Sequence, residues 1–148
     1  AYHSTRHPVR EIMARDVIEG DLTCDALADW LVSQDGVPLA FSSANPEQVR
    51  SVQDTYGRER SAAALETFFA DLARAVRTKG ATRIITAGGE TSGAIVEGLG
   101  LETLDIGPEI DPGVPALRAA PDLVVALKSG NFGATDFFEK ADKVLAGA

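Results

Sequence analysis

The sequence RIITAGGETSG, residues 83–93, runs from an apolar segment through a glycine-rich turn into a helical pattern. The segment Arg83–Ala87 is nearly all apolar rather than alternating, which is typical of a strand covered on both faces. The glycines that follow permit a tight turn, and a helix is expected over Thr91–Leu99. A strand that leads directly into a helix is the repeating unit of an α/β fold.

The same alternation of short apolar runs and helical patterns continues on both sides of this segment. Further strands are expected over Pro38–Ser42, Thr103–Ile106 and Leu123–Leu127, with a weaker one within Arg10–Val17. Further helices are expected over Asp21–Gln34, after the N-cap residue Asn45, over Arg58–Lys79 and over Asp136–Leu145. We therefore predict one α/β domain over residues 1–148, with a parallel or mixed sheet of about five strands and helices on both faces.

Composition and charge argue against several classes of protein. The chain has 148 residues, with 14 Lys and Arg against 22 Asp and Glu, so its net charge is −8. Such acidity disfavours nucleic acid as a partner, because binding to its phosphate backbone depends on Lys and Arg. The longest apolar runs fall far short of the ~20 residues that span a bilayer, so no membrane partner is expected. With a single cysteine and no apolar signal segment, a cytoplasmic location is expected.

The first turn, Gly88–Gly93, is a candidate phosphate site. Its glycines allow the backbone to approach a ligand, and Thr91 or Ser92 could cap the helix while free N–H groups face outward. A plain tight turn with a capping residue is the alternative interpretation. The known phosphate motifs, Walker A and the dinucleotide fingerprint, do not fit this spacing. The candidate binding residues are Gly88, Gly89, Glu90, Thr91, Ser92 and Gly93.

Two other turns follow expected strands. The second turn, Lys128–Gly133, combines a cation, a hydroxyl, an amide and glycines at the carboxyl end of a strand, where open α/β sheets bind ligands. The third turn, Gly107–Pro115, is rich in proline and glycine, which predicts a stiff, non-regular excursion. The candidate binding residues of the second turn are Lys128, Ser129, Gly130, Asn131 and Gly133.

Local charge determines what kind of phosphate ligand could bind. No Lys or Arg occurs from Ile84 to Leu117, whereas several Asp and Glu do. A bare polyphosphate would be repelled there, so a nucleotide would need Mg²⁺. Glu90 and Glu109 are the available carboxylates, and simple solvation of such groups is the alternative.

The remaining candidate groups are weaker. His3 and His7 have a helical metal-ligand spacing, but Pro8 follows and a frayed tail is the favoured interpretation. Cys24 lies in an amphipathic helix and is expected to be a small core residue. Ser42 and Ser43 end a strand and could contact a ligand or cap the next helix. One apolar stripe of the Arg58–Lys79 helix is expected to pack in the core: Leu65, Phe68, Phe69, Leu72 and Val76.

Together, the three turns resemble the C-terminal nucleotide-binding domain of the four-carbon acid sugar kinases, a family that includes 3-oxo-tetronate, threonate and erythronate kinases. The resemblance spans about residues 38–145 and rests on three ordered motifs at Gly88–Gly93, Ile106–Pro115 and Leu127–Gly133. It implies that Gly88–Ser92 cradle the phosphates of ATP and that Gly130 and its neighbours contact nucleotide. It also implies that a separate N-terminal domain binds the acid sugar.

The chain departs from that family in ways that bear on activity. The family's Gly-Ser-Cys-Ser type motif does not occur before His3, the acid-sugar domain is missing, and Ala116 stands where many relatives have an aromatic residue. We therefore expect a domain truncated at its N-terminus that binds ATP or ADP with Mg²⁺ but does not catalyse alone, and no catalytic residue is assigned. One alternative is a non-catalytic module that binds a phosphorylated metabolite or a partner domain. Another is a homodimer formed through the apolar surface that the missing domain would cover.

Overall fold

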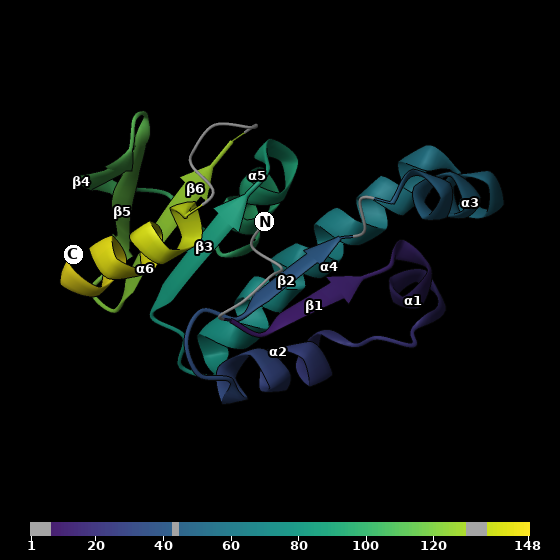
Figure 1. Ribbon diagram of the computed structural model, residues 1–148, viewed down its shortest axis with the longest axis horizontal. Helices are drawn as coiled ribbons and strands as arrows, with labels where there is room; N and C mark the ends of the chain where they lie inside the picture. The colour runs from purple at the N-terminus through teal and green to yellow at the C-terminus, as the bar shows by residue number, and fades with distance from the viewer. Residues whose placement is uncertain (1–6, 43–44, 130–135) are drawn as a thin grey trace.

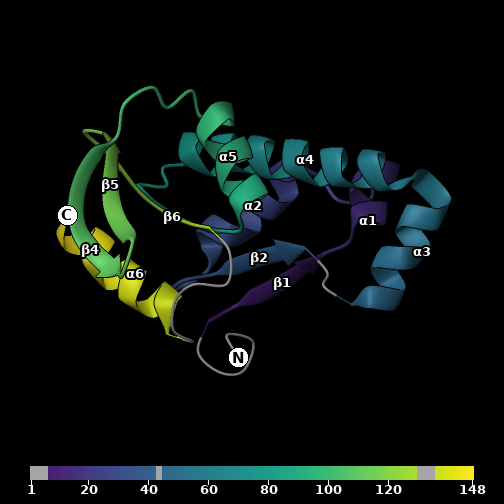
Figure 2. The ribbon, with the colours of Figure 1, turned by 90° about the horizontal axis from the view of Figure 1, so that it is seen from above.

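The computed structural model describes residues 7–42, 45–129 and 136–148 (Figures 1 and 2). Its strands are β1 (Val9–Ile12), β2 (Leu39–Ser42), β3 (Arg83–Ala87), β4 (Asp105–Asp111), β5 (Val114–Ala120) and β6 (Leu123–Lys128). Its helices are α1 (Ala14–Glu19), α2 (Cys24–Ser33), α3 (Pro46–Tyr56), α4 (Arg58–Thr78), α5 (Gly89–Gly98) and α6 (Phe137–Gly147). The predicted α/β class is thereby confirmed.

The first sheet is the parallel pair β1 and β2, with Val9 opposite Leu39 and Ile12 opposite Ser42. It packs with α2 and α4 around a core whose centre is formed by side chains that are almost wholly removed from water. Because Ile12 lies opposite Ser42, the two strands end side by side, and α1 and α3 lie beyond these ends (Figure 1). The buried residues of this core are Ile12, Leu27, Ala28, Phe68 and Leu72.

The second sheet has the strand order β3-β6-β5-β4 and is mixed. β3 and β6 are parallel, whereas β5 is antiparallel to both β6 and β4. One face packs against α6, and α5 contacts β3 and β6 from the other side (Figure 2). Helices therefore lie on both faces, as predicted for a mixed sheet, but the described strands are divided between two sheets rather than joined in one.

Helices α4 and α5 approach each other closely because Gly98 has no side chain. A Cβ added at Gly98 would lie 2.8 Å from the Cβ of Ala70 and 3.3 Å from its Cα. Small residues at such a crossing let two helices pack at short range. This contact fixes α5, and with it the first turn, against the longest helix of the fold.

The third turn is not the non-regular excursion that its prolines predict. Residues Gly107–Pro115 belong to the β4–β5 hairpin, whose tight turn has Gly113 at φ +81°. Pro108 is accommodated because β4 is an edge strand, where a missing N–H breaks no ladder bond that the sheet requires. Of the expected strand Thr103–Ile106, only Asp105 and Ile106 belong to β4, which continues to Asp111.

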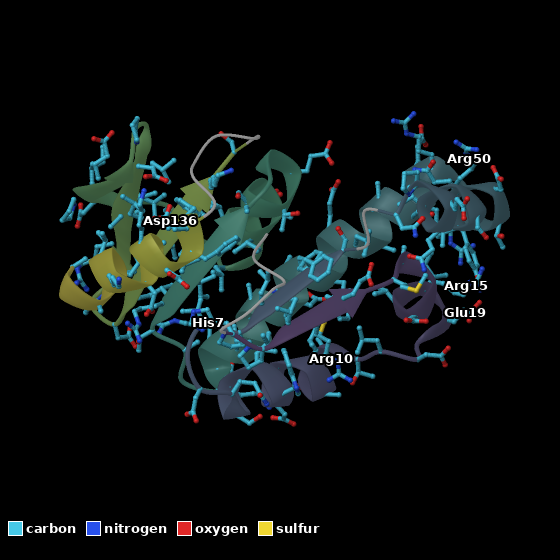
Figure 3. The ribbon with its side chains drawn as sticks, viewed as in Figure 1. His7, Arg10, Arg15, Glu19, Arg50 and Asp136 are labelled. Atoms are coloured by element: carbon cyan, nitrogen blue, oxygen red, sulfur yellow. The ribbon has the colours of Figure 1, made fainter. Side chains whose placement is uncertain are left out.

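Two other local expectations are also corrected. The strand expected within Arg10–Val17 is β1, which starts one residue earlier at Val9 and ends at Ile12, because α1 begins at Ala14. His7 is not part of a frayed tail, since its Nδ1 accepts a hydrogen bond from the Val37 N–H at 3.1 Å and its Nε2 lies 3.7 Å from Glu139. Figure 3 shows His7 near the start of β1, on the opposite side of the molecule from Arg15 and Arg50.

The fold also bears on membrane insertion. Within the described residues, no helix combines the length and the apolar character needed to cross a membrane.

Candidate functional site

The first and second turns meet at one edge of the mixed sheet. β3 and β6 run parallel, with Ala87 opposite Lys128, and the Gly88 N–H donates to the Lys128 carbonyl at 2.8 Å. The two turns therefore start side by side at the carboxyl ends of adjacent strands, which is the position where open α/β sheets hold ligands. The sequence predicted that each turn follows a strand, but it did not indicate that the two strands are neighbours in the sheet.

The start of α5 leaves backbone donors without a helical acceptor. Gly88 is the N-cap residue at φ +111°, a conformation that only glycine adopts readily, and no side chain caps the helix. The first bond within the helix runs from the Ser92 N–H to the Gly88 carbonyl at 2.9 Å. The N–H groups of Gly89, Glu90 and Thr91 precede it, so they have no acceptor within the helix. The prediction that Thr91 or Ser92 caps this helix was therefore wrong.

The hydroxyl of Ser92 has another partner. Ser92 and Thr86 are 7% and 4% exposed, and their hydroxyl oxygens lie 2.6 Å apart. Thr86 is on β3, so this buried contact links the N-terminal end of helix α5 to the strand that precedes it. Ser92 thus contributes to the position of the glycines through its side chain.

We expect Thr86→Val to lower the free energy of unfolding by about 1–3 kcal/mol, because it leaves a buried Ser92 hydroxyl without its partner. The double variant Thr86→Val/Ser92→Ala should lose less than the sum of the two single changes. Urea unfolding measures all three, with exposed Thr82→Val as a control that stays within ~0.5 kcal/mol of the unaltered chain. Strict additivity would show that the two hydroxyls do not interact.

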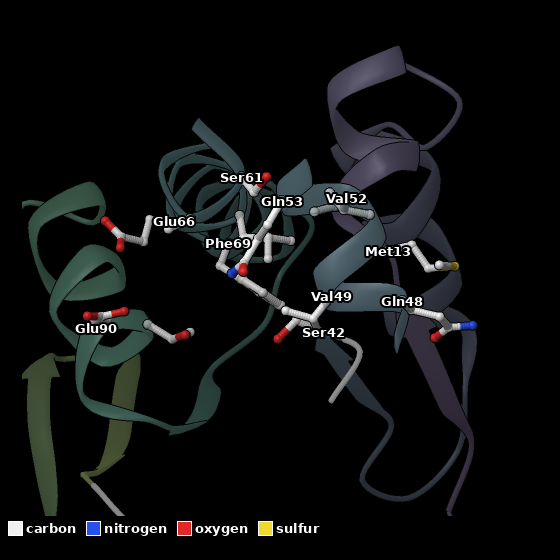
Figure 4. A pocket seen from close by; sticks show the side chains of 14 residues that line it. Met13, Ser42, Gln48, Val49, Val52, Gln53, Ser61, Glu66, Phe69 and Glu90 are labelled. Carbon is white, nitrogen blue, oxygen red and sulfur yellow. The ribbon is translucent and has the colours of Figure 1, made fainter. Parts of the chain in front are cut away.

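A pocket of about 240 Å³ opens beside the first turn (Figure 4). Its walls come from the carboxyl end of β2, from Met13 and Ala14 at the start of α1, from α3 and α4, and from the first residues of α5. It therefore joins the first sheet to the uncapped end of α5. The lining residues are Met13, Ala14, Ser42, Gln48, Val49, Val52, Gln53, Ser61, Ala62, Leu65, Glu66, Phe69, Glu90 and Thr91.

Charged and apolar groups are separated within this pocket. Glu66 and Glu90 lie at one end, near the start of α5, whereas Met13 and Gln48 lie at the other (Figure 4). Phe69 lies between them, and no Lys or Arg is among the lining residues. The pocket as a whole is thus acidic at the end next to the first turn and neutral elsewhere.

The start of α3, which lines the pocket, is capped by a side chain. The N-cap residue Asn45 accepts hydrogen bonds from the N–H groups of Glu47 and Gln48, at 3.0 and 3.4 Å. Its role as cap of α3 confirms the prediction from the sequence. Among the helices that line the pocket, α3 is capped by a side chain, whereas α1, α4 and α5 have no side-chain cap.

The other predicted site residues lie apart from the pocket or outside the described residues. The Lys128 ammonium is 5.8 Å from the centre of the Phe137 ring, and Ser129 is exposed. Glu109 lies on β4, at the edge of the mixed sheet opposite β3, and its carboxylate accepts from the Gly113 N–H at 2.8 Å. Glu90 and Glu109 are therefore not neighbouring carboxylates. His3, Ser43, Gly130, Asn131 and Gly133 fall outside the described residues.

The described residues contain no group of three or more His, Cys, Asp or Glu side chains that could hold a metal ion. The Asp111 carboxylate is instead paired with the Lys140 ammonium at 3.1 Å.

Cys24 does not have the surroundings of a nucleophile. It packs beside the core of the first sheet, and its thiol donates to the Phe68 carbonyl at 3.4 Å. Burial, followed by the charges of Asp71 and Asp25, raises the pKa of this thiol above its ordinary value of 9.0. The expectation of a small residue packed with the core is confirmed.

Because the thiolate is the reactive form, we expect iodoacetamide to label Cys24 slowly at pH 7. The rate should rise with pH and reach half of its maximum only above pH 9.0, since the folded pKa is raised. Mass spectrometry of labelled chain across a pH series measures this, and a half-maximal rate below pH 9.0 would contradict it. Unfolding in urea should restore ordinary thiol reactivity.

Comparisons with known proteins identify the family. The family described as "Nucleotide-binding C-terminal domain" matches residues 1–138. The chain belongs to this family. This nucleotide-binding C-terminal domain is 40% identical over 97% of its length to a 3-oxo-tetronate kinase of Brucella melitensis. It is 41% identical over 100% of its length to a 3-oxo-tetronate kinase of Pseudomonas savastanoi.

The domain spans only about a third of these relatives, 34% and 35% of their lengths. Two solved structures are likewise matched over only about a third of their own chains. A protein of Salmonella typhimurium superposes with a TM-score of 0.83 at 37% identity, over 93% of this domain and 35% of that chain. A protein of Haemophilus influenzae superposes with the same TM-score at 35% identity, over 93% of this domain and 34% of that chain.

The sequence did not single out most of the pocket. Glu66, Gln53 and Met13 received no role, and Phe69 was assigned to the core stripe of α4. Phe69 does pack beside the core of the first sheet, but it also lines the pocket. The only signal in the sequence was a polar residue, Glu66, next to that stripe, and such residues are common on amphipathic helices.

Proposed function

We propose that this chain binds ATP, and ADP as its product, through the first turn, with the second turn alongside. The observation that carries the proposal is the uncapped start of α5, which offers the N–H groups of Gly89, Glu90 and Thr91 next to a pocket. Backbone donors at a helix N-terminus, together with the helix dipole, favour a phosphate group. The family to which the chain belongs supports a nucleotide as the source of that phosphate.

The shape of the first turn fits a phosphate. A Cβ added at Gly89 or Gly93 would meet no atom within 4 Å, so the space in front of these glycines is open. A ligand can therefore reach the backbone directly. The residues proposed to contact nucleotide are Gly88, Gly89, Glu90, Thr91, Ser92, Gly93, Lys128, Ser129, Gly130, Asn131 and Gly133. Of these, Gly130, Asn131 and Gly133 lie outside the described residues.

The acidic end of the pocket bears on the need for Mg²⁺. Glu66 and Glu90 would repel an uncompensated polyphosphate, whereas a bound Mg²⁺ would neutralise part of the charge on the phosphate oxygens. With few protein ligands available, the ion would enter together with ATP. Glu90, at the start of α5, is the carboxylate best placed to face it.

We propose further that the whole protein is a kinase for a four-carbon acid sugar of the 3-oxo-tetronate, threonate or erythronate type. Relatives that are about 40% identical are named 3-oxo-tetronate kinases, and this chain corresponds to a third of them. The acid-sugar site and the catalytic residues would lie in the remaining portion, so this chain alone should bind nucleotide without phosphorylating sugar. A cytoplasmic location fits a chain in which Cys24 is a free thiol.

Calorimetric titration of the chain with Mg-ATP and Mg-ADP tests the proposal. We expect both to bind, and expect ligand at ten times Kd to add about 1.4 kcal/mol of stability, visible as a rise in Tm. Neither heat nor a thermal shift at millimolar nucleotide would overturn nucleotide binding. Binding of a sugar phosphate in place of ATP would instead support a module for phosphorylated metabolites, because the same N–H groups can hold any phosphate.

A further inference from the structure

The end of the pocket remote from the first turn is suited to a ligand without charge. Met13, Val49 and Val52 supply apolar surface there, Phe69 lies between this end and the acidic one, and Gln53 adds an amide. Ligand pockets of this composition hold flat, largely apolar groups and orient them by a few polar contacts. An aromatic ring such as Phe69 offers a face or an edge against which a planar ring can pack.

Anions are disfavoured at this end. No Lys or Arg lines the pocket, and the N–H groups at the start of α3 already donate to Asn45. An acid sugar or a phosphate would therefore find no compensating side-chain charge on this side. The same anions would meet the carboxylates of Glu66 and Glu90 on the other side.

We propose that this neutral end receives the base of the nucleotide, with Phe69 packing against the ring and the Gln53 amide hydrogen-bonding to its edge. The assignment rests on the proposed function, since it takes the phosphates to lie at the first turn. A volume of about 240 Å³ is enough for a ring system but not for a complete nucleoside triphosphate, so the phosphates must extend out of the pocket. Helix α3 then becomes the element that selects the base.

The Gln53 side chain suits this role. It lies half-buried in the pocket, and an amide can both donate to and accept from the edge of a heterocyclic base. Its backbone carbonyl accepts from the Gly57 N–H at 2.8 Å, which fixes the end of α3 independently of the side chain. Replacement of the amide should therefore leave the helix in place.

Calorimetry with four probes tests the assignment. Mg-ATP reports on the whole site, Mg-tripolyphosphate on the phosphate part, and adenosine and guanosine on the base part. Gln53→Leu should weaken Mg-ATP and adenosine by about 5- to 10-fold, the value of one hydrogen bond, and leave tripolyphosphate within twofold. Gln34→Leu, at the end of α2 and away from the pocket, is the matched control and should change nothing. Stronger binding of adenosine than of guanosine, or the reverse, identifies the base.

The outcomes distinguish this assignment from the function on which it rests. If Mg-ATP binds but Gln53→Leu leaves its affinity within twofold, the base lies elsewhere and the assignment is overturned while nucleotide binding stands. If Mg-ATP does not bind the unaltered chain, the proposed function itself fails. Thermal unfolding of Gln53→Leu confirms that the variant is folded, and Phe69→Leu provides a second test that should weaken adenosine but not tripolyphosphate.

Discussion

Gly89→Val should reduce the affinity of the chain for Mg-ATP about 100-fold, which corresponds to the loss of two charge-assisted hydrogen bonds of about 1.5 kcal/mol each. Gly89 is the first residue of α5, where a ligand must approach the backbone to reach the N–H groups. Its Cβ would point into open space rather than into the protein, so the branched side chain would occupy the volume needed by the phosphates. Calorimetric titration measures the change.

The matched control is Gly147→Val at the end of α6. A Cβ at Gly147 also meets no atom within 4 Å, but this glycine is remote in sequence and structure from the first turn. We expect Gly147→Val to bind Mg-ATP as the unaltered chain does, and both variants to unfold cooperatively on heating. Equal affinities of the two variants would contradict the assignment of the first turn.

Leu27→Ala should lower the free energy of unfolding by about 2–5 kcal/mol, the range for removing a large aliphatic side chain from a core. Leu27 lies on α2, is 0% exposed and packs in the core that joins α2 and α4 to the first sheet. Because a domain of this kind is stable by only about 5–15 kcal/mol, the loss is a large fraction of the total.

Val32→Ala on the same helix is the control for this change. Val32 is 45% exposed, so its replacement should alter stability by no more than ~0.5 kcal/mol. Urea unfolding of both variants gives the comparison. A loss of less than ~1 kcal/mol for Leu27→Ala would show that α2 is not packed against α4 as described.

The elements that the sequence predicts well are those with local signals. Asn45 caps α3, the glycine turn follows β3, and the apolar run at β6 forms a buried strand, all as expected from nearby residues. The expectation of a strand covered on both faces was wrong for β3, in which only Thr86 is buried, because β3 is an edge strand of its sheet. The β4–β5 hairpin was missed for a physical reason. Its proline at position 108 disfavours a central strand but is tolerated at the edge of a sheet, and the edge is determined by pairing with distant residues.

The residues that line the pocket were still harder to predict from the sequence than the hairpin. The sequence indicated the first turn because its glycines are adjacent, but Met13, Gln53 and Phe69 come from three separate elements. They meet only after the start of α1, α3 and α4 have packed together. The absence of a side-chain cap on α5 could not be predicted either, because Ser92 has a buried partner, Thr86, that competes for its hydroxyl.

The most direct test of the account follows the backbone N–H groups of the first turn themselves. A ¹⁵N-labelled chain titrated with Mg-ADP should show its largest amide chemical-shift changes at Gly89, Glu90 and Thr91, whose N–H groups have no acceptor within α5. Smaller changes are expected at residues of α3 that line the pocket. Unchanged amide signals for these three residues at saturating nucleotide would contradict the claim that the start of α5 holds the phosphates.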